Sequence, residues 1–311
     1  QTLESETRAS RRGRAFSAVG ALRLARRDSG GARQAFQASL AVHPRGVSGA
    51  RAASALLDMG DLDADLALLA AQTLEGAGDS RRSLEAYRRY EGLLPDSMAM
   101  DPEVGLIMAR LLSAVGQHDT AVREFRILVE TDDPEFELRV LDQWLRTRRR
   151  QGRRDAARTI QGWIIERFPE SSQAVDIVFA RAAAAQDGGT YAEAAAGFER
   201  AMTMAPSLSS AGHARMRLGQ IHLLRNDVVA AAGVFQAYLD DFPDGRRWEQ
   251  AAYWAARSLE ELGKDQEARG YLDMIRERSP VSYYRVLVSE RLDESYGPPV
   301  PTGPVSDPPE W

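Results

Sequence analysis

Six arginines lie within nine residues near the middle of this sequence, and their spacing could serve anion binding. Guanidinium groups form paired, charge-assisted hydrogen bonds with carboxylates and phosphates, so an anionic polymer or an acidic partner would suit them. A solvated helix end is the alternative, because cations also interact favourably with the C-terminal helix dipole. The candidate anion or partner site consists of Arg148, Arg149, Arg150, Arg153 and Arg154, with Arg146 beside them.

A second group combines basic and aromatic side chains, at Arg246, Arg247 and Trp248, with Tyr253 and Trp254 close behind. Aromatic faces stack on sugar rings, so the first three residues are a candidate groove for a glycan or a partner. Tyr253 and Trp254 fall inside a predicted helix, where core packing is the usual use of an aromatic. For Trp248, near a turn, both interpretations stay open.

Patterns that would indicate catalysis or a bound cofactor are weak. The sequence has no cysteine, and its four histidines show no zinc-ligand spacing. Asp61, Asp63 and Asp65 imitate the start of a calcium-binding loop, but Leu66 and Gln72 replace the glycine and the bidentate glutamate that such a loop requires. We therefore expect helix capping there, and we predict no catalytic residue, cofactor or metal.

The elements that must position these groups follow a repeat. Prolines recur at steps of 39, 35, 37, 37 and 37 residues, at Pro95, Pro134, Pro169, Pro206, Pro243 and Pro280. A turn-forming residue precedes each by 17 or 18 residues, at Gly78, Gly116, Gly152, Gly189, Asn226 and Gly263. Five residues after each turn comes a small side chain, at Ser83, Ala121, Ala157, Ala194, Ala231 and Ala268. Nine residues after the turn five units have a large side chain, at Tyr87, Phe125, Phe198, Phe235 and Leu272, and the unit of Gly152 has Gln161.

This pattern predicts a pair of helices in each unit. Glycine or asparagine adopts the left-handed conformation that ends the first helix, and the small residue lets the second helix approach closely. The large side chain fills the space between layers, and proline ends the second helix. The predicted fold is all-α, a right-handed superhelix (α-solenoid) of helix-turn-helix repeats with a period of about 37 residues. The spacing resembles the tetratricopeptide repeat over about residues 14–280.

The domain limits follow from where the pattern holds. Residues 1–13 are expected to be disordered or frayed, and the solenoid to span residues 14–295. Within it, degenerate repeats cover residues 14–75, with an extra helix over residues 58–74, six clearer repeats cover residues 60–280 and a closing helix covers residues 281–295. The Pro-rich residues 296–311 read as a linker toward a missing C-terminal region.

Composition narrows the possible partners. The formal net charge of −5 gives no overall attraction to nucleic acid, and no run is apolar enough to span a membrane. The sequence begins with Gln1 and has no apolar signal segment, so we expect a processed or trimmed chain. Absence of cysteine suits an oxidising bacterial envelope.

The last third of the sequence has three distinctive stretches. They are residues 235–243, residues 251–257 with Leu262 and Gly263, and the closing residues 282–284 and 289–292. Together they resemble the superhelical, non-catalytic domain of bacterial soluble lytic transglycosylases. Ser289 stands where that family has alanine, and Arg285 replaces a glycine after the aromatic pair.

The resemblance implies a periplasmic or envelope scaffold that shapes or positions the enzyme on peptidoglycan glycan strands. The catalytic glutamate of that family belongs to a separate domain, and none of the Glu-Ser pairs here, at Glu4, Glu170 and Glu294, precedes the family's Gly-Leu-Met-Gln motif. Whether the parent protein is an enzyme stays open. The alternative is a stand-alone tetratricopeptide adaptor that binds an envelope protein.

Overall fold

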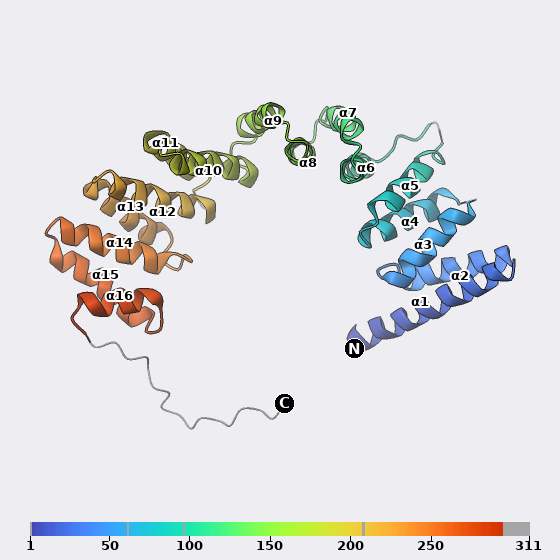
Figure 1. Ribbon diagram of the computed structural model, residues 1–311, viewed down its shortest axis with the longest axis horizontal. Coiled ribbons are helices and arrows are strands. Elements are labelled where there is room, and N and C mark those ends of the chain that lie inside the picture. The colour runs from blue at the N-terminus through green and yellow to red at the C-terminus, as the bar shows by residue number, and fades with distance from the viewer. Residues whose placement is uncertain (1, 61, 96, 207–208, 295–311) are drawn as a thin grey trace, which may run out of the picture. The chain divides into compact units, whose positions relative to one another are not determined.

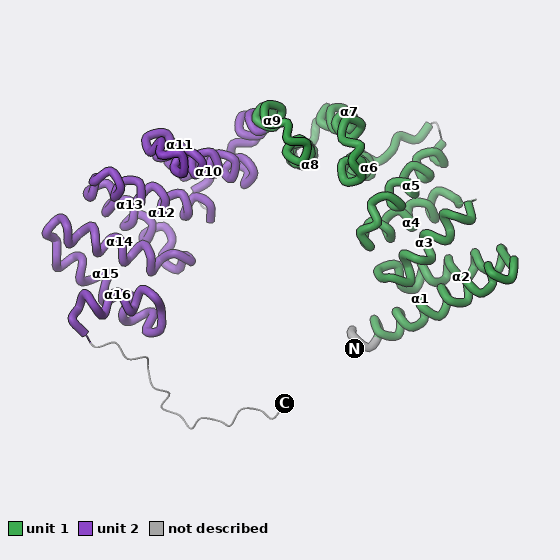
Figure 2. Tube along the Cα trace, viewed as in Figure 1, with its two compact units in different colours: residues 1–160 green, residues 161–311 purple. Residues whose placement is uncertain are grey.

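The computed structural model describes residues 2–60, 62–95, 97–206 and 209–294, and every regular element in these ranges is an α-helix (Figure 1). This confirms the predicted all-α solenoid class. None of the helices in these ranges is long and apolar enough to cross a membrane. The chain divides into two compact units, residues 1–160 and 161–311, which we describe separately (Figure 2). The expected linker, residues 296–311, lies outside the described residues.

Unit 1 contains eight helices and the start of a ninth within the described residues. They are α1 (Thr2–Ala25), α2 (Ser29–Val42), α3 (Val47–Met59), α4 (Ala64–Gly76), α5 (Ser80–Glu91), α6 (Pro102–Ala114), α7 (His118–Leu128) and α8 (Pro134–Arg150). The boundary between the units falls within α9 (Arg154–Arg167). Unit 2 continues with α10 (Ser172–Asp187), α11 (Tyr191–Met204), α12 (Ser209–Leu224), α13 (Val228–Asp241), α14 (Trp248–Glu261), α15 (Asp265–Arg278) and α16 (Tyr283–Arg291).

The predicted turn residues end the first helix of each pair. All six have a positive φ, between 60° and 86°, the left-handed conformation that closes a helix. The first pair, α1 and α2, shows the same geometry with Arg27 at φ 61° in place of glycine. Ala32 and Phe36 follow Arg27 by five and nine residues, and both are buried. The degenerate first unit therefore obeys the same template.

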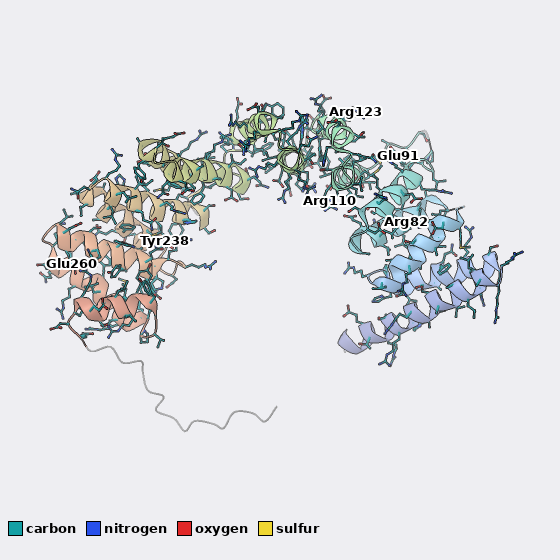
Figure 3. The ribbon with its side chains drawn as sticks, in the orientation of Figure 1. Arg82, Glu91, Arg110, Arg123, Tyr238 and Glu260 are labelled. Atoms are coloured by element: carbon teal, nitrogen blue, oxygen red, sulfur yellow. The ribbon has the colours of Figure 1, made fainter. Side chains whose placement is uncertain are left out.

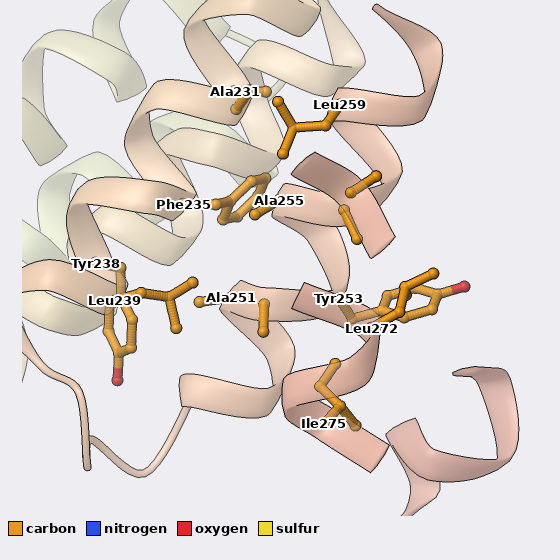
Figure 4. Close-up of a cluster of buried hydrophobic side chains, with 14 of the residues drawn as sticks. Ala231, Phe235, Tyr238, Leu239, Ala251, Tyr253, Ala255, Leu259, Leu272 and Ile275 are labelled. Carbon is orange, nitrogen blue, oxygen red and sulfur yellow. The ribbon is translucent and has the colours of Figure 1, made fainter. Parts of the chain in front are cut away.

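The second helix of each pair contributes the large side chain that the repeat predicts. Tyr87, Phe125, Phe198 and Phe235 are among the largest fully buried side chains of the described residues. In unit 2, Phe235 lies in a cluster with small residues of α14, such as Ala255, and with larger side chains at its edge (Figure 4). In the unit of Gly152, the residue before Gln161 is a buried isoleucine.

The space for each large side chain comes from a small residue of the first helix, 16 positions earlier. That position is Gly20, Ala71, Ala109, Ala182, Gly219 and Ala256 in the six pairs with a large residue, and each of the four alanines is buried. A Cβ at Gly20 would lie 2.6 Å from the Phe36 ring, and one at Gly219 would lie 2.5 Å from the Phe235 ring. In the remaining pair this position is Leu145, and the partner position is the polar Gln161.

The prolines do not all end helices. Five of the six follow a second helix within four residues, but Pro134 is the first residue of α8. Asp133 caps that helix, and its side chain accepts from the backbone N–H groups of Glu135 and Phe136 at 2.9 and 3.1 Å. A proline at the first helical position loses no intrahelical hydrogen bond, so this shift explains the unequal steps of 39 and 35 residues.

The N-terminal part corrects two expectations. Residues 2–25 form one helix, α1, where residues 1–13 were expected to be disordered or frayed. A buried hydrogen bond joins this helix to α2, because Ser39 donates to the Gly13 carbonyl at 2.8 Å and both residues are buried.

The extra helix of the N-terminal part is α3, and not the predicted residues 58–74. Gly60, at φ 69°, ends α3, and Asp63 begins α4 by accepting from the Leu66 N–H at 2.8 Å. The capping role expected for this acidic stretch is confirmed at Asp63, whereas Asp61 lies outside the described residues.

Two glycines of unit 2 give opposite predictions for the same substitution. Gly219→Ala should lower the unfolding free energy by about 1–3 kcal/mol, because the new methyl group overlaps the Phe235 ring. Gly233→Ala on the exposed face of α13 meets no atom within 4 Å and should raise it by up to about 1 kcal/mol. Urea unfolding followed by circular dichroism measures both. Equal effects of the two changes would contradict the packing described.

Candidate functional site

Unit 2 contains a groove bordered by α10, α12, α13 and the loop before α14. Its volume is about 470 Å³. The residues that line it are Asp176, Phe179, Ser209, Ser210, Gly212, His213, Tyr238, Phe242, Gly245, Arg246 and Arg247. The structure therefore brings two residues of the predicted groove, Arg246 and Arg247, next to aromatic side chains that sequence reasoning did not select.

Two aromatic pairs form the walls of this groove. The rings of Phe179 and His213 are 4.7 Å apart, and those of Tyr238 and Phe242 are 5.2 Å apart. The Tyr238 hydroxyl accepts from the Arg247 backbone N–H at 3.2 Å, so the tyrosine labelled in Figure 3 holds the arginine loop against α13. Gly245 permits this approach, since a Cβ there would lie 2.6 Å from the hydroxyl oxygen. The walls are thus fixed by packing on both sides.

The groove is electrostatically positive. Asp176 is the only carboxylate among its lining residues, and neither Arg246 nor Arg247 forms an ion pair with a carboxylate within the described residues. Burial lowers the pKa of the His213 imidazole, and the positive charges of Arg247 and Arg217 lower it further. An anionic group of a ligand would be stabilised in this setting.

The third residue predicted for the groove, Trp248, is not among its lining residues. Its ring packs against the core cluster of unit 2, and the Arg278 guanidinium lies 4.3 Å from the ring centroid. Arg278 in turn donates to Asp244 at 2.8 Å. Trp248 therefore stabilises the start of α14 through its contacts with the core cluster and with Arg278, and it does not line the groove. Tyr253 and Trp254 also pack in or against this core cluster.

The arginine cluster lies in unit 1, at the end of α8 and the start of α9. Arg148 is partly buried and donates to Gln151 at 2.9 Å, whereas Arg149, Arg150, Arg153 and Arg154 are exposed. Among the described residues, no ion pair involves these five arginines.

Positive charges lie near Arg148, the partly buried member of this cluster. Burial lowers the pKa of the Arg148 guanidinium, Arg126 and Arg153 lower it as well, and only Asp119 opposes them. The Nε atom of Arg148 is buried without a hydrogen-bond partner. The cluster can accept an anion, and both interpretations given for it stay open.

No group of three or more histidines, aspartates and glutamates could hold a metal ion within the ranges that the structure describes. The aromatic and charged side chains of the groove offer a ligand ring contacts and charge pairing.

One sequence signal could have located the groove. The residue 13 positions before the turn is polar in every pair, and it is Arg14, Asp65, Glu103, Arg139, Asp176, His213 and Gln250. Two successive members, Asp176 and His213, line the groove of unit 2. This position is polar in every first helix, whereas neighbouring positions on the same helices are apolar. It therefore marks the face of the first helices that lies outside the core.

Sequence comparison identifies the repeat. Two models of the tetratricopeptide repeat match residues 179–246 and 250–280. These residues form tetratricopeptide repeats. They include nearly all of the groove, from Phe179 to Arg246. Repeats of this kind indicate a scaffold for protein–protein interaction. No curated protein sequence matches the chain.

Solved structures of tetratricopeptide proteins show a distant likeness. A thermophilic TPR protein of Thermus thermophilus is 17% identical, with a TM-score of 0.31, and the match covers 62% of this chain and 99% of that one. YrrB, a TPR protein with an unusual peptide-binding site, is 15% identical at a TM-score of 0.37, covering 61% and 92%. Yeast Tom70 is 14% identical at a TM-score of 0.37, covering 93% and 54%.

The depressed pKa of His213 predicts how unit 2 responds to acid. The folded state favours the neutral ring, so below about pH 6.5 the unfolded chain binds more protons than the folded chain. Stability should therefore fall as the pH drops from 6.5 toward the folded pKa. An NMR titration should place the pKa of His213 below 6.5, and Arg247→Ala should raise it. Arg225→Ala, an exposed change that removes the same charge, is the control. An unshifted pKa in the Arg247 variant would contradict the electrostatics described.

Proposed function

We propose that this chain is a scaffold that binds an acidic segment of a protein partner in the groove of unit 2. The observation that carries the proposal is the pair of arginines, Arg246 and Arg247, which line a groove with aromatic walls and form no ion pair within the described residues. Tetratricopeptide repeats as a class support a protein partner.

The groove suits a short peptide with an acidic and an apolar side chain. An acidic group can pair with the arginines, and an apolar or aromatic residue can contact the rings of Phe179 and Phe242. Asp176, which also lines the groove, can accept from a backbone N–H of the same peptide. A volume of about 470 Å³ is within the ordinary range of ligand pockets and holds a few side chains.

The test selects displayed peptides on the purified chain and measures the affinity of the best synthetic peptide. We expect acidic and aromatic residues to be enriched, and Arg246→Ala/Arg247→Ala to weaken binding tenfold or more, because each charged hydrogen bond contributes about 1.5–3 kcal/mol. Arg200→Ala/Arg225→Ala removes the same charge at two exposed positions outside the groove and should change affinity less than twofold. Binding should also weaken with salt. Equal losses in the two double variants would refute the site.

A second candidate places the scaffold in a bacterial cell envelope, where it would position a peptidoglycan-cleaving enzyme on glycan strands. It is supported by the resemblance of residues 235–263 and 282–292 to the superhelical domain of lytic transglycosylases. The arginines would then contact the acidic groups of the glycan and its peptides, and the rings would face sugar rings.

Purified peptidoglycan tests this second candidate. Co-sedimentation of the chain with sacculi, lost in Arg246→Ala/Arg247→Ala and kept in the Arg200/Arg225 control, is the expected result. Release of anhydro-muropeptides would show that the chain itself cleaves peptidoglycan and would overturn a purely scaffolding role. Binding of selected peptides without binding of sacculi leaves the protein-partner function alone.

A further inference from the structure

Unit 1 contains two adjoining recesses, one on each side of α3. The first, of about 1020 Å³, lies between α1 and α3, and the second, of about 670 Å³, lies between α3 and the turn from α4 to α5. They share four lining residues, Gly46, Val47, Arg51 and Ala55. Together they form one trough that crosses the inserted helix.

The trough exists because α3 presents small side chains outward. Ala50 and Ser54 lie one helical turn apart along its floor, with Ala55 beside them. The wall that α1 forms opposite α3 also has small side chains, Ala18 and Ala21.

Large apolar groups border this low floor. Val47 of α3 is 71% exposed and Leu24 of α1 is 41% exposed, and both line the first recess. Solvent-exposed apolar side chains around an apolar floor are typical of a surface that a partner covers.

The charges of the trough are not balanced. Arg14 and Arg51 line the first recess without any carboxylate, and neither forms an ion pair within the part of the chain that the structure describes. The carboxylates of the second recess are already engaged. Asp58 accepts from Arg82 (labelled in Figure 3) at 2.7 and 3.0 Å, and Asp79 caps α5 through the Arg82 N–H at 3.1 Å.

We propose that this trough binds an amphipathic α-helix of a protein partner, with the apolar face of the helix on α1 and α3 and its acidic side chains opposite Arg14 and Arg51. An apolar floor offers no backbone hydrogen bonds, and only a helix satisfies its own backbone there. Small floor residues let a helix lie close, and Arg14 and Arg51, which form no ion pair within the described ranges, select acidic flanks.

The experiment selects 18-residue peptides displayed on phage against the full chain. Peptides with apolar residues at helical spacing and with acidic flanks are the expected result. The best synthetic peptide should become helical on binding, and Arg14→Ala/Arg51→Ala should weaken it tenfold or more. Arg12→Ala/Arg45→Ala, at positions that do not line the trough, is the charge-matched control. Ala55→Glu, which puts a carboxylate on the floor, should weaken the peptide at least as much.

Several outcomes would overturn this proposal. The selection could yield no helical peptide, or the selected peptide could bind equally well with a proline at its centre. The control variant could lose as much affinity as the trough variant. Sedimentation could show that the chain self-associates through this face, or the face could bind anionic lipid vesicles in place of the peptide. Arg246→Ala/Arg247→Ala should leave the helical peptide bound, so failure here and failure of the unit 2 groove are separable. Circular dichroism of each variant confirms folding.

Discussion

The contact on which the rest of this structure depends is found in every helix pair except α8 and α9, and it joins one large side chain of the second helix to a glycine or alanine 16 residues earlier. The large side chain can enter only where the opposite helix has almost no side chain, as Phe235 does over Gly219. Close packing of this kind fixes how near the two helices of a pair lie and which face of the first helix stays outside. That outer face supplies the walls of the grooves.

Because a few buried positions specify each pair, the outer position of the first helix is free to change its charge. At one step the charges of successive pairs satisfy each other, because Arg139 donates to Glu103 at 2.9 Å. Arg14 forms no ion pair within the described residues, although the next pair has Asp65 at this position, and it lines the trough of unit 1. His213 stands beside Asp176 in the groove of unit 2. Binding surfaces thus arise where this outer position remains unpaired or only partly compensated.

The candidate groove could be found from the sequence only in part. Arg246 and Arg247 were visible because basic and aromatic residues adjoin in the sequence, but Phe179 and His213 come from two other helices. Trp248 was grouped with the arginines because it is their neighbour. Since α14 begins at Trp248 and each helical residue turns by about 100°, its ring faces the core. The regularly polar position before each turn was present in the sequence and was the missed signal.

The sequence by itself determined the all-α solenoid, the turn residues, the small and large positions of the second helices and the capping role of Asp63. These follow from local chemistry and from a period that repeats within one chain. Only the tertiary structure decided that α3 is the inserted helix, that residues 2–13 continue α1, and that Arg246 and Arg247 meet Phe179 and His213. These features depend on contacts between residues distant in the sequence, and such contacts leave no spacing pattern within any single helix.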